Sequence, residues 1–217
     1  GVLAVVTGRE MAQHCEPWTG VLKNYPGMKS AAQYPLAVDK AVWQGEPVVA
    51  VVGASRALAE DGCARVRVTW EPLPAVVHLE DAAKEGARKV WEDCPQGNVG
   101  FRLMFGNKEA TDAAFAQAKH VVELRIENNR LSPVAMEPRA AIGDYNVAEE
   151  SYTLYTTSQN PHGVRMEMSH IFHVPENRIR VISPDVGGGF GLKGNPFPDD
   201  ALVLWAARRL RRPVISV

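Results

Sequence analysis

Residues 186–193 read Val-Gly-Gly-Gly-Phe-Gly-Leu-Lys, and the elements on either side of this stretch set the expected fold class. An alternating, β-branched run precedes it at 178–182, and a run of helix formers follows it at 199–212. The helical run begins with two aspartates and ends among four arginines, the charge order that the helix dipole favours. Successive glycines cost conformational entropy but allow positive φ angles and close backbone approach, so the stretch predicts a loop that presents main-chain N–H donors to a ligand. On its own it would also suit a phosphate loop or a tight turn.

The spacing within this glycine loop argues against two nucleotide-binding motifs. The loop is not G-x-G-x-x-G, and it lacks the G-x-x-x-x-G-K-[ST] pattern of a P-loop. No acidic residue stands at a strand end about twenty positions further on, where a dinucleotide-binding fold would place the ribose ligand. A nicotinamide-dependent dehydrogenase is therefore disfavoured.

Towards the N-terminus, residues 156–162 read Thr-Thr-Ser-Gln-Asn-Pro-His and predict a strand end running into a helix. Pro161 suits the first helical position, and either Ser158 or Asn160 is expected to cap the helix. Capping leaves Gln159 without a structural role. Its neutral amide can donate to an oxo group and accept from a hydroxyl, which is useful beside a metal that changes oxidation state.

A third polar cluster lies earlier, at residues 131–139, which read Leu-Ser-Pro-Val-Ala-Met-Glu-Pro-Arg. It places Glu137 and Arg139 around two prolines. Considered as isolated charges, these two side chains are expected to pair with each other as a solvated ion couple.

The remaining periodicity predicts an α+β (mixed α/β) fold in two domains. Residues 1–83 are expected to form the first domain, 84–97 a charged and mostly unpatterned linker, and 98–217 the second domain. The chain opens in a strand-like run at 1–6. Further strands are predicted at 48–52, buried on both faces, and at 66–70 and 120–127; further helices are predicted at 55–61 and 108–119.

Composition narrows the class of partner. A net charge of −1 with both signs mixed gives no field that would select nucleic acid or an anionic membrane, and no apolar run is long enough to span a bilayer. Cys15, Cys63 and Cys94 form no C-x-x-C pair, so free thiols in the cytoplasm are expected rather than a zinc or iron–sulfur site. Because the sequence begins and ends inside strand-like runs, we expect it to be a piece of a longer protein.

Together and in this order, the three clusters resemble the large subunit of the molybdenum hydroxylases, the family of xanthine dehydrogenase, aldehyde oxidase and aerobic carbon monoxide dehydrogenase. Residues 157–162 resemble the family's [ST]-x-Q-N-[PT] segment, and 187–193 resemble its G-G-G-F-G-x-K loop. Residues 136–139, Met-Glu-Pro-Arg, resemble the M-E-P segment that precedes both. Residues 34–77 look like the a/b hammerhead domain at the front of that subunit, so 98–217 would be the first portion of the molybdopterin-binding domain.

The resemblance implies a function and a set of site residues. In the family, a pterin-bound molybdenum hydroxylates a carbon with oxygen from water, and electrons pass to a 2Fe-2S small subunit and an FAD-binding medium subunit. By position, Gln159 matches the glutamine that hydrogen-bonds an oxo ligand, and it is assigned a catalytic role together with Phe190. The residues that match the cofactor-binding positions are Gly187, Gly188, Gly189, Phe190, Gly191 and Gln159, and no residue is expected to bind the metal directly. The resemblance also implies molybdopterin cytosine dinucleotide, present in the complete subunit and absent from this chain alone.

Two departures from the family pattern shape the substrate expectation. Xanthine oxidases carry a substrate-binding Glu after the loop lysine, whereas this chain has Gly194 after Lys193; the carbon monoxide dehydrogenase-like branch and a small, non-purine substrate are therefore favoured. The family's catalytic base would lie beyond Val217, so no residue here is given that role. The alternative is a cofactor-free binding or scaffold module that keeps the fold without the chemistry.

Overall fold

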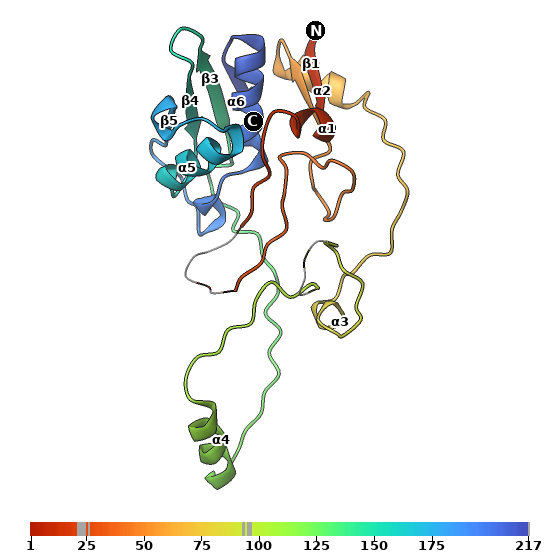
Figure 1. The fold of residues 1–217 in the computed structure, drawn as a ribbon, viewed down its shortest axis with the longest axis vertical. Helices are drawn as coiled ribbons and strands as arrows, with labels where there is room; N and C mark the ends of the chain where they lie inside the picture. The colour runs from red at the N-terminus through yellow and green to blue at the C-terminus, as the bar shows by residue number, and fades with distance from the viewer. Residues whose placement is uncertain (21–24, 26, 93, 95–96, 217) are drawn as a thin grey trace.

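The computed structural model describes residues 1–20, 25, 27–92, 94 and 97–216, and its principal unit is a four-stranded sheet (Figure 1). The strands lie in the order β5-β4-β3-β6, with bounds Ile179–Ile182, Ser151–Thr156, Ala141–Asn146 and Val214–Ser216. β3 and β4 form an antiparallel hairpin, β6 pairs antiparallel with β3, and β5 pairs parallel with β4. The parallel pair is joined by α5, Pro161–Phe172, and by a short 3-10 turn at Glu176–Arg178.

Two helices cover one face of this sheet. Tyr152 of β4 stacks on Phe172 of α5 at 5.7 Å between ring centroids, and its hydroxyl accepts a hydrogen bond from Arg208 of α6, Pro198–Leu210. α6 lies directly against β3, because a Cβ added at Gly143 would stand 2.5 Å from the backbone of Val203. A glycine at this position therefore sets how closely helix and sheet can approach.

The N-terminal region adds an antiparallel pair, β1 (Val2–Thr7) and β2 (Val49–Gly53), beside α6 (Figure 1). α1 (Gly8–Met11) follows β1, and α2 (Arg56–Cys63) packs on β2. The buried cluster is shared between this region and the larger sheet; from the N-terminal side it includes Val6, Met11, Cys15 and Leu36. The division into domains at 1–83, 84–97 and 98–217 stays a prediction, and residues 93, 95 and 96 of its linker lie outside the described residues.

Most of the predicted helices and strands are confirmed with small shifts. α2 begins one residue after its cap, Ser55, and α4 spans Lys108–Gln117. β5, α6 and the strand at the start of the chain also match. β2 differs in one respect: every residue of it is half-buried, whereas the continuous apolar run predicted burial on both faces.

Two predicted strands are wrong. Residues 66–70 and 120–127 are outside any strand and their apolar side chains are largely exposed; Val122, for example, is 90% exposed. Both segments have strand-like residues, but a strand also needs a neighbour to receive its main-chain hydrogen bonds, and no segment of the described ranges pairs with them. β3, by contrast, was not predicted, because its sequence contains a glycine, an aspartate and an asparagine.

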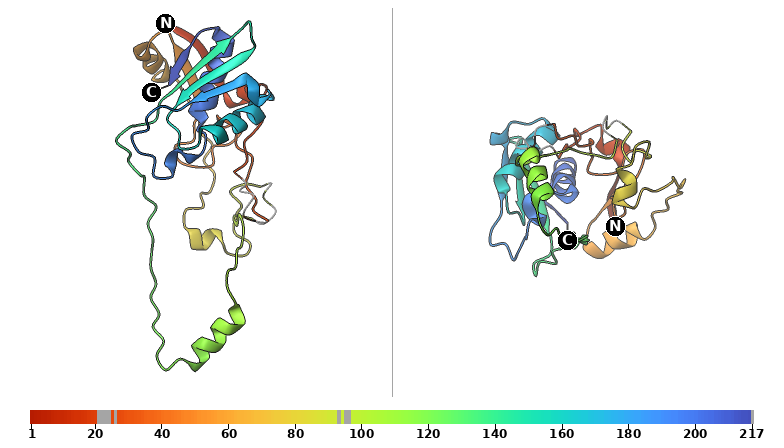
Figure 2. Two further views of the ribbon diagram at one scale, coloured as in Figure 1. Left: turned by 90° about the vertical axis from the view of Figure 1, so that its left-hand side faces the viewer. Right: turned by 90° about the horizontal axis from the view of Figure 1, so that it is seen from below.

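Residues 101–136 form an arm that reaches far from the sheet, with α4 at its tip (Figures 1 and 2). Several large apolar side chains of this arm are 75% to 97% exposed: Met104, Phe105, Val122, Leu124, Leu131 and Met136. The short helix α3, Leu79–Ala82, lies between the N-terminal region and the arm (Figure 1). No helix within the described ranges is long and apolar enough to cross a membrane.

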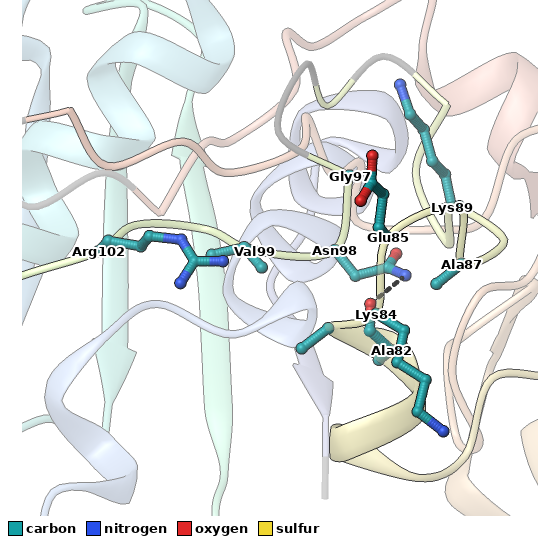
Figure 3. Close-up of a pocket in the computed structure, with 11 residues that line it drawn as sticks. Ala82, Lys84, Glu85, Ala87, Lys89, Gly97, Asn98, Val99 and Arg102 are labelled. Atoms are coloured by element: carbon teal, nitrogen blue, oxygen red, sulfur yellow. Dashed lines mark hydrogen bonds between the residues drawn. The ribbon is translucent and has the colours of Figure 1, made fainter.

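A hollow lies beside α3, within residues 82–102 (Figure 3). Asn98 lines it and donates its side-chain amide to the carbonyl groups of Ala82, at 3.1 Å, and Arg88, at 2.8 Å. Three cationic side chains line the hollow but point in different directions: Lys84, Lys89 and Arg102. Their charges do not converge on a common point, so this hollow is not the candidate site.

Candidate functional site

The glycine loop and Gln159 form one site. The Gln159 side-chain oxygen, Oε1, accepts the main-chain N–H groups of Gly191, at 3.0 Å, and Lys193, at 3.2 Å. The Gln159 main-chain N–H in turn donates to the Lys193 carbonyl at 2.8 Å. Gln159 is thus joined by three hydrogen bonds to two loop residues that lie 32 and 34 positions further along the chain, as the family resemblance implied.

Glu137 holds the other end of the loop. Its Oε2 atom accepts the Gly187 N–H at 2.8 Å and the Lys193 ammonium at 2.8 Å, and its main-chain N–H donates to the Gly187 carbonyl at 3.2 Å. The Lys193 Nζ also donates to the Glu137 carbonyl at 2.9 Å. The hydrogen bonds from Lys193 and Gly187 lower the pKa of the Glu137 carboxyl, because both favour its ionised form.

The expected ion pair between Glu137 and Arg139 is therefore wrong. Arg139 instead pairs with Asp199 at 3.0 Å and lies over the ring of Phe197, 3.9 Å from its centroid. The reason is the side chain of Lys193, which is only 1% exposed. A buried ammonium needs a compensating carboxylate much more than a solvated guanidinium does, and Glu137 supplies it.

Glycine is required in the loop for two separate structural reasons. Gly188 and Gly191 have φ angles of +100° and +87°, which side chains rarely adopt. Gly187 and Gly189 are required by close packing, because an added Cβ would stand 2.6 Å from Glu137 Cβ and 2.4 Å from the Gln159 amide. Packing inside the chain thus explains two glycines, while the other two set the course of a loop that remains at the surface.

The middle of the loop carries unpaired main-chain donors: Gly189 is buried, Gly188 is half-buried, and only Phe190 is exposed. Within the described ranges, the main-chain N–H groups of Gly188, Gly189 and Phe190 donate to no acceptor, and neither does the side-chain nitrogen of Gln159. Phe190 is 76% exposed and has a φ of +51°, a left-handed conformation that is uncommon for a bulky residue. Its ring lies over Gly188, where an added Cβ would come within 3.0 Å of it. The loop therefore presents a row of donors next to an aromatic ring.

Hydroxyl and amide groups fix the segment that carries Gln159. The Asn160 side chain accepts the Gly163 N–H at 3.0 Å and caps α5, which confirms one of the two capping possibilities. Ser158 exchanges two 3.0 Å hydrogen bonds with the side chain of Ser183, at the end of β5. Gln159 is thus held between a helix cap and a strand end, so its amide has a defined position.

Sequence reasoning missed the part that Lys193 and Asp200 play. Asp200 is buried at the N-terminus of α6, where it accepts the Phe197 N–H at 2.9 Å, and burial raises the pKa of its carboxyl. The sequence pattern indicates Lys193 only as the last residue of the glycine-loop motif and predicts no partner for its side chain. An acidic residue at the third position of a proline-initiated helix is a signal that could have identified the cap.

The site offers a group of hydrogen-bond donors. In the part of the chain that the structure describes, no three histidine, cysteine, aspartate or glutamate side chains gather as a metal-binding group. The donors of the loop, the Gln159 amide and the Phe190 ring suit a polar, acceptor-rich ligand with a flat or apolar portion. Fold and site together define a mixed α/β module with a glycine loop held beside the Gln159 amide.

Comparison with known proteins identifies the family. The molybdopterin cofactor-binding domain matches residues 90–217. The nicotine 6-hydroxylase large subunit of Paenarthrobacter nicotinovorans is 35% identical over 99% of this chain and 26% of its own length, and the carbon monoxide dehydrogenase large chain of Hydrogenophaga pseudoflava is 31% identical over 99% and 27%. The crystal structure of quinoline 2-oxidoreductase from Pseudomonas putida 86 superposes with a TM-score of 0.89 and 34% identity, over 99% of this chain and 27% of that one.

The chain therefore belongs to the molybdopterin-binding large subunits of the xanthine dehydrogenase, aldehyde oxidase and carbon monoxide dehydrogenase family. It spans about a quarter of the length of the relatives it matches.

Proposed function

We propose that this chain supplies one wall of the cofactor site in a molybdenum hydroxylase that oxidises a small molecule with oxygen derived from water. The observation that carries the proposal is the row of unpaired N–H groups at Gly188, Gly189 and Phe190 beside the Gln159 amide. Buried donors are normally satisfied, and Gly189 is buried and Gly188 half-buried, so four unpaired donors grouped on one loop favour an acceptor that binds there.

The residues present fit a molybdenum-pterin group. When bound, that group supplies the redox and oxygen-transfer chemistry, whereas this chain supplies position and hydrogen bonds. Gly188, Gly189 and Phe190 would donate main-chain N–H groups towards it. Gln159 would donate its side-chain N–H, since its oxygen is already occupied by the loop. The Phe190 ring would shield the reacting side from water.

Finer features of the whole protein are proposed from the family resemblance. We propose the cytosine dinucleotide form of the pterin, transfer of electrons to a 2Fe-2S small subunit and an FAD-binding medium subunit, and action in the cytoplasm, where free thiols such as these persist. Relatives are named for nicotine, quinoline and carbon monoxide, which supports a small substrate. We also propose that residues 1–83 form an a/b hammerhead domain and 98–217 the first portion of the molybdopterin-binding domain.

Metal and nucleotide analysis tests this function. The full-length protein, purified with the subunits that accompany it, is expected to contain stoichiometric molybdenum and to release a pterin and a cytidine nucleotide on denaturation. A well-folded protein that contains neither, after expression in a host that makes the cofactor, would favour the scaffold alternative and overturn the proposal.

A further inference from the structure

The ion pair between Glu137 and Lys193 is the most deeply buried charge pair in the described part of the chain. The Lys193 side chain is 1% exposed, and its ammonium donates to the Glu137 carbonyl and to the Glu137 carboxylate. A buried ammonium without a carboxylate is strongly unfavourable, so the position of one residue depends on the other.

The same pair controls both ends of the loop. The Glu137 oxygen that receives the ammonium also receives the Gly187 N–H, where the loop begins. The main chain of Lys193 binds Gln159 through both its N–H and its carbonyl, where the loop ends. The ends are thus held by one connected set of hydrogen bonds, while the main-chain N–H groups of residues 188–190 between them donate to no acceptor in the described part of the chain.

We propose that Glu137 and Lys193 are positioning residues, which orient the donor loop and the Gln159 amide towards the cofactor without contacting it. The inference rests on the proposed function for the direction in which the donors face. The dependence of the loop on Glu137 and Lys193 does not require the proposed function, because it follows from the hydrogen bonds within this chain. The Lys193 side chain is enclosed by protein and Glu137 is turned to the loop base, so both act through Gly187, Gly191 and Gln159.

A neighbouring ion pair provides a matched control. Arg139 lies two residues after Glu137 and pairs with Asp199 at 3.0 Å, which ties the same segment to α6 instead of to the loop. Both side chains of that pair are partly exposed. An Arg139→Met variant therefore removes an ion pair from this segment while leaving the loop contacts in place.

The experiment compares Glu137→Gln, Lys193→Met and Arg139→Met in the full-length protein with its accompanying subunits. Amide hydrogen exchange over residues 184–193 is measured first, because Gly187, Gly191 and Lys193 are the loop amides that this network protects. We expect exchange to be about tenfold faster in Glu137→Gln and Lys193→Met, in line with loss of a charge-assisted hydrogen bond. The exchange rate of the Arg139→Met control should equal that of wild type. The electron paramagnetic resonance spectrum of molybdenum, recorded after partial reduction with dithionite, is expected to change in the same two variants.

Each outcome decides the inference. Unchanged exchange and an unchanged spectrum in Glu137→Gln and Lys193→Met would overturn it. A single variant could fail to fold because a charge is left buried, and the double variant Glu137→Gln/Lys193→Met then removes both charges. The double variant should fold, and its loop amides should exchange faster than those of wild type. Exchange at the wild-type rate in the double variant also overturns the inference. Absence of molybdenum from the wild-type protein would count against the proposed function alone, since hydrogen exchange still tests the positioning role.

Discussion

The side-chain oxygen of Gln159 lies 3.0 Å from the main-chain nitrogen of Gly191, 32 residues further along the chain. A second N–H, that of Lys193, reaches the same oxygen. The oxygen is therefore used inside the protein, and of the two functions that a neutral amide offers, only donation through Nε2 remains for a ligand. Gln159 thus has two separable tasks: its oxygen organises the loop, and its nitrogen, which has no partner within the described residues, is left for a ligand.

Gln159→Glu and Gln159→Ala are expected to separate these tasks in the complete enzyme. The glutamate keeps an acceptor for the loop but loses the donor, so turnover should fall while the hydrogen exchange of residues 187–193 stays as in wild type. The alanine loses both, and each neutral hydrogen bond to the loop contributes about 0.5 to 1.5 kcal/mol, so loop exchange should also accelerate. Equal loop exchange in the two variants would contradict this division.

Gly188→Val is expected to reduce the molybdenum and pterin content of the purified enzyme. The residue has a φ of +100°, and its side chain would meet the ring of Phe190 and the Cβ of Ala135. A β-branched residue resists this φ, so the loop should shift. Gly194→Ala is the matched control, because an added Cβ there meets nothing within 4 Å. Wild-type cofactor content in Gly188→Val would show that this glycine is not needed for close approach.

The sequence predicted best the elements whose signals are local. α5 could be placed because Asn160 and Pro161 mark its start, and its cap forms as expected. α6 has acidic residues at one end and arginines at the other. The strand at 120–127 shows the opposite case, since alternation alone cannot supply the neighbour that a strand requires.

In the candidate site, too, the contacts that depend on the folded chain could not be predicted from local sequence. The meeting of Gln159 with the glycine loop could be predicted from the family resemblance. The pairing of Glu137 with Lys193 could not be predicted from local sequence, because 56 residues separate them and a charge nearer in the chain, Arg139, was the simpler partner. Burial decides that pairing, and burial is a property of the folded chain.

Cys15, which is buried, and Cys63, which is exposed, are expected to differ in reactivity. Cys15 is buried in the shared core and its thiol donates to the Met11 carbonyl at 3.1 Å; burial, with a smaller effect of Glu16, raises the pKa of the thiol from 9.0 to about 11. The thiolate is the nucleophile, so this shift lowers the reactive fraction about a hundredfold at neutral pH. Cys63 on α2 is exposed. Iodoacetamide should therefore label Cys63 in the folded protein and Cys15 only in urea, as measured by peptide mass spectrometry. Equal labelling of both in the folded protein would show that the N-terminal region does not share the core.

Acidification is expected to release the glycine loop through Glu137. Its pKa is lowered from the ordinary 4.5 by the hydrogen bonds from Lys193 and Gly187, so its contribution to stability is complete above that value and is lost as the pH falls through the folded-state pKa. Asp200 acts with the opposite sign, because its raised pKa gives a contribution that is lost as the pH rises. The comparison must therefore be the difference between wild type and Glu137→Gln, in which Asp200 cancels. Urea unfolding from about pH 6 to pH 3 should show that the stability advantage of wild type over Glu137→Gln shrinks on acidification. An advantage that stayed constant over this range would mean that the Glu137 carboxylate is not the group that holds the loop.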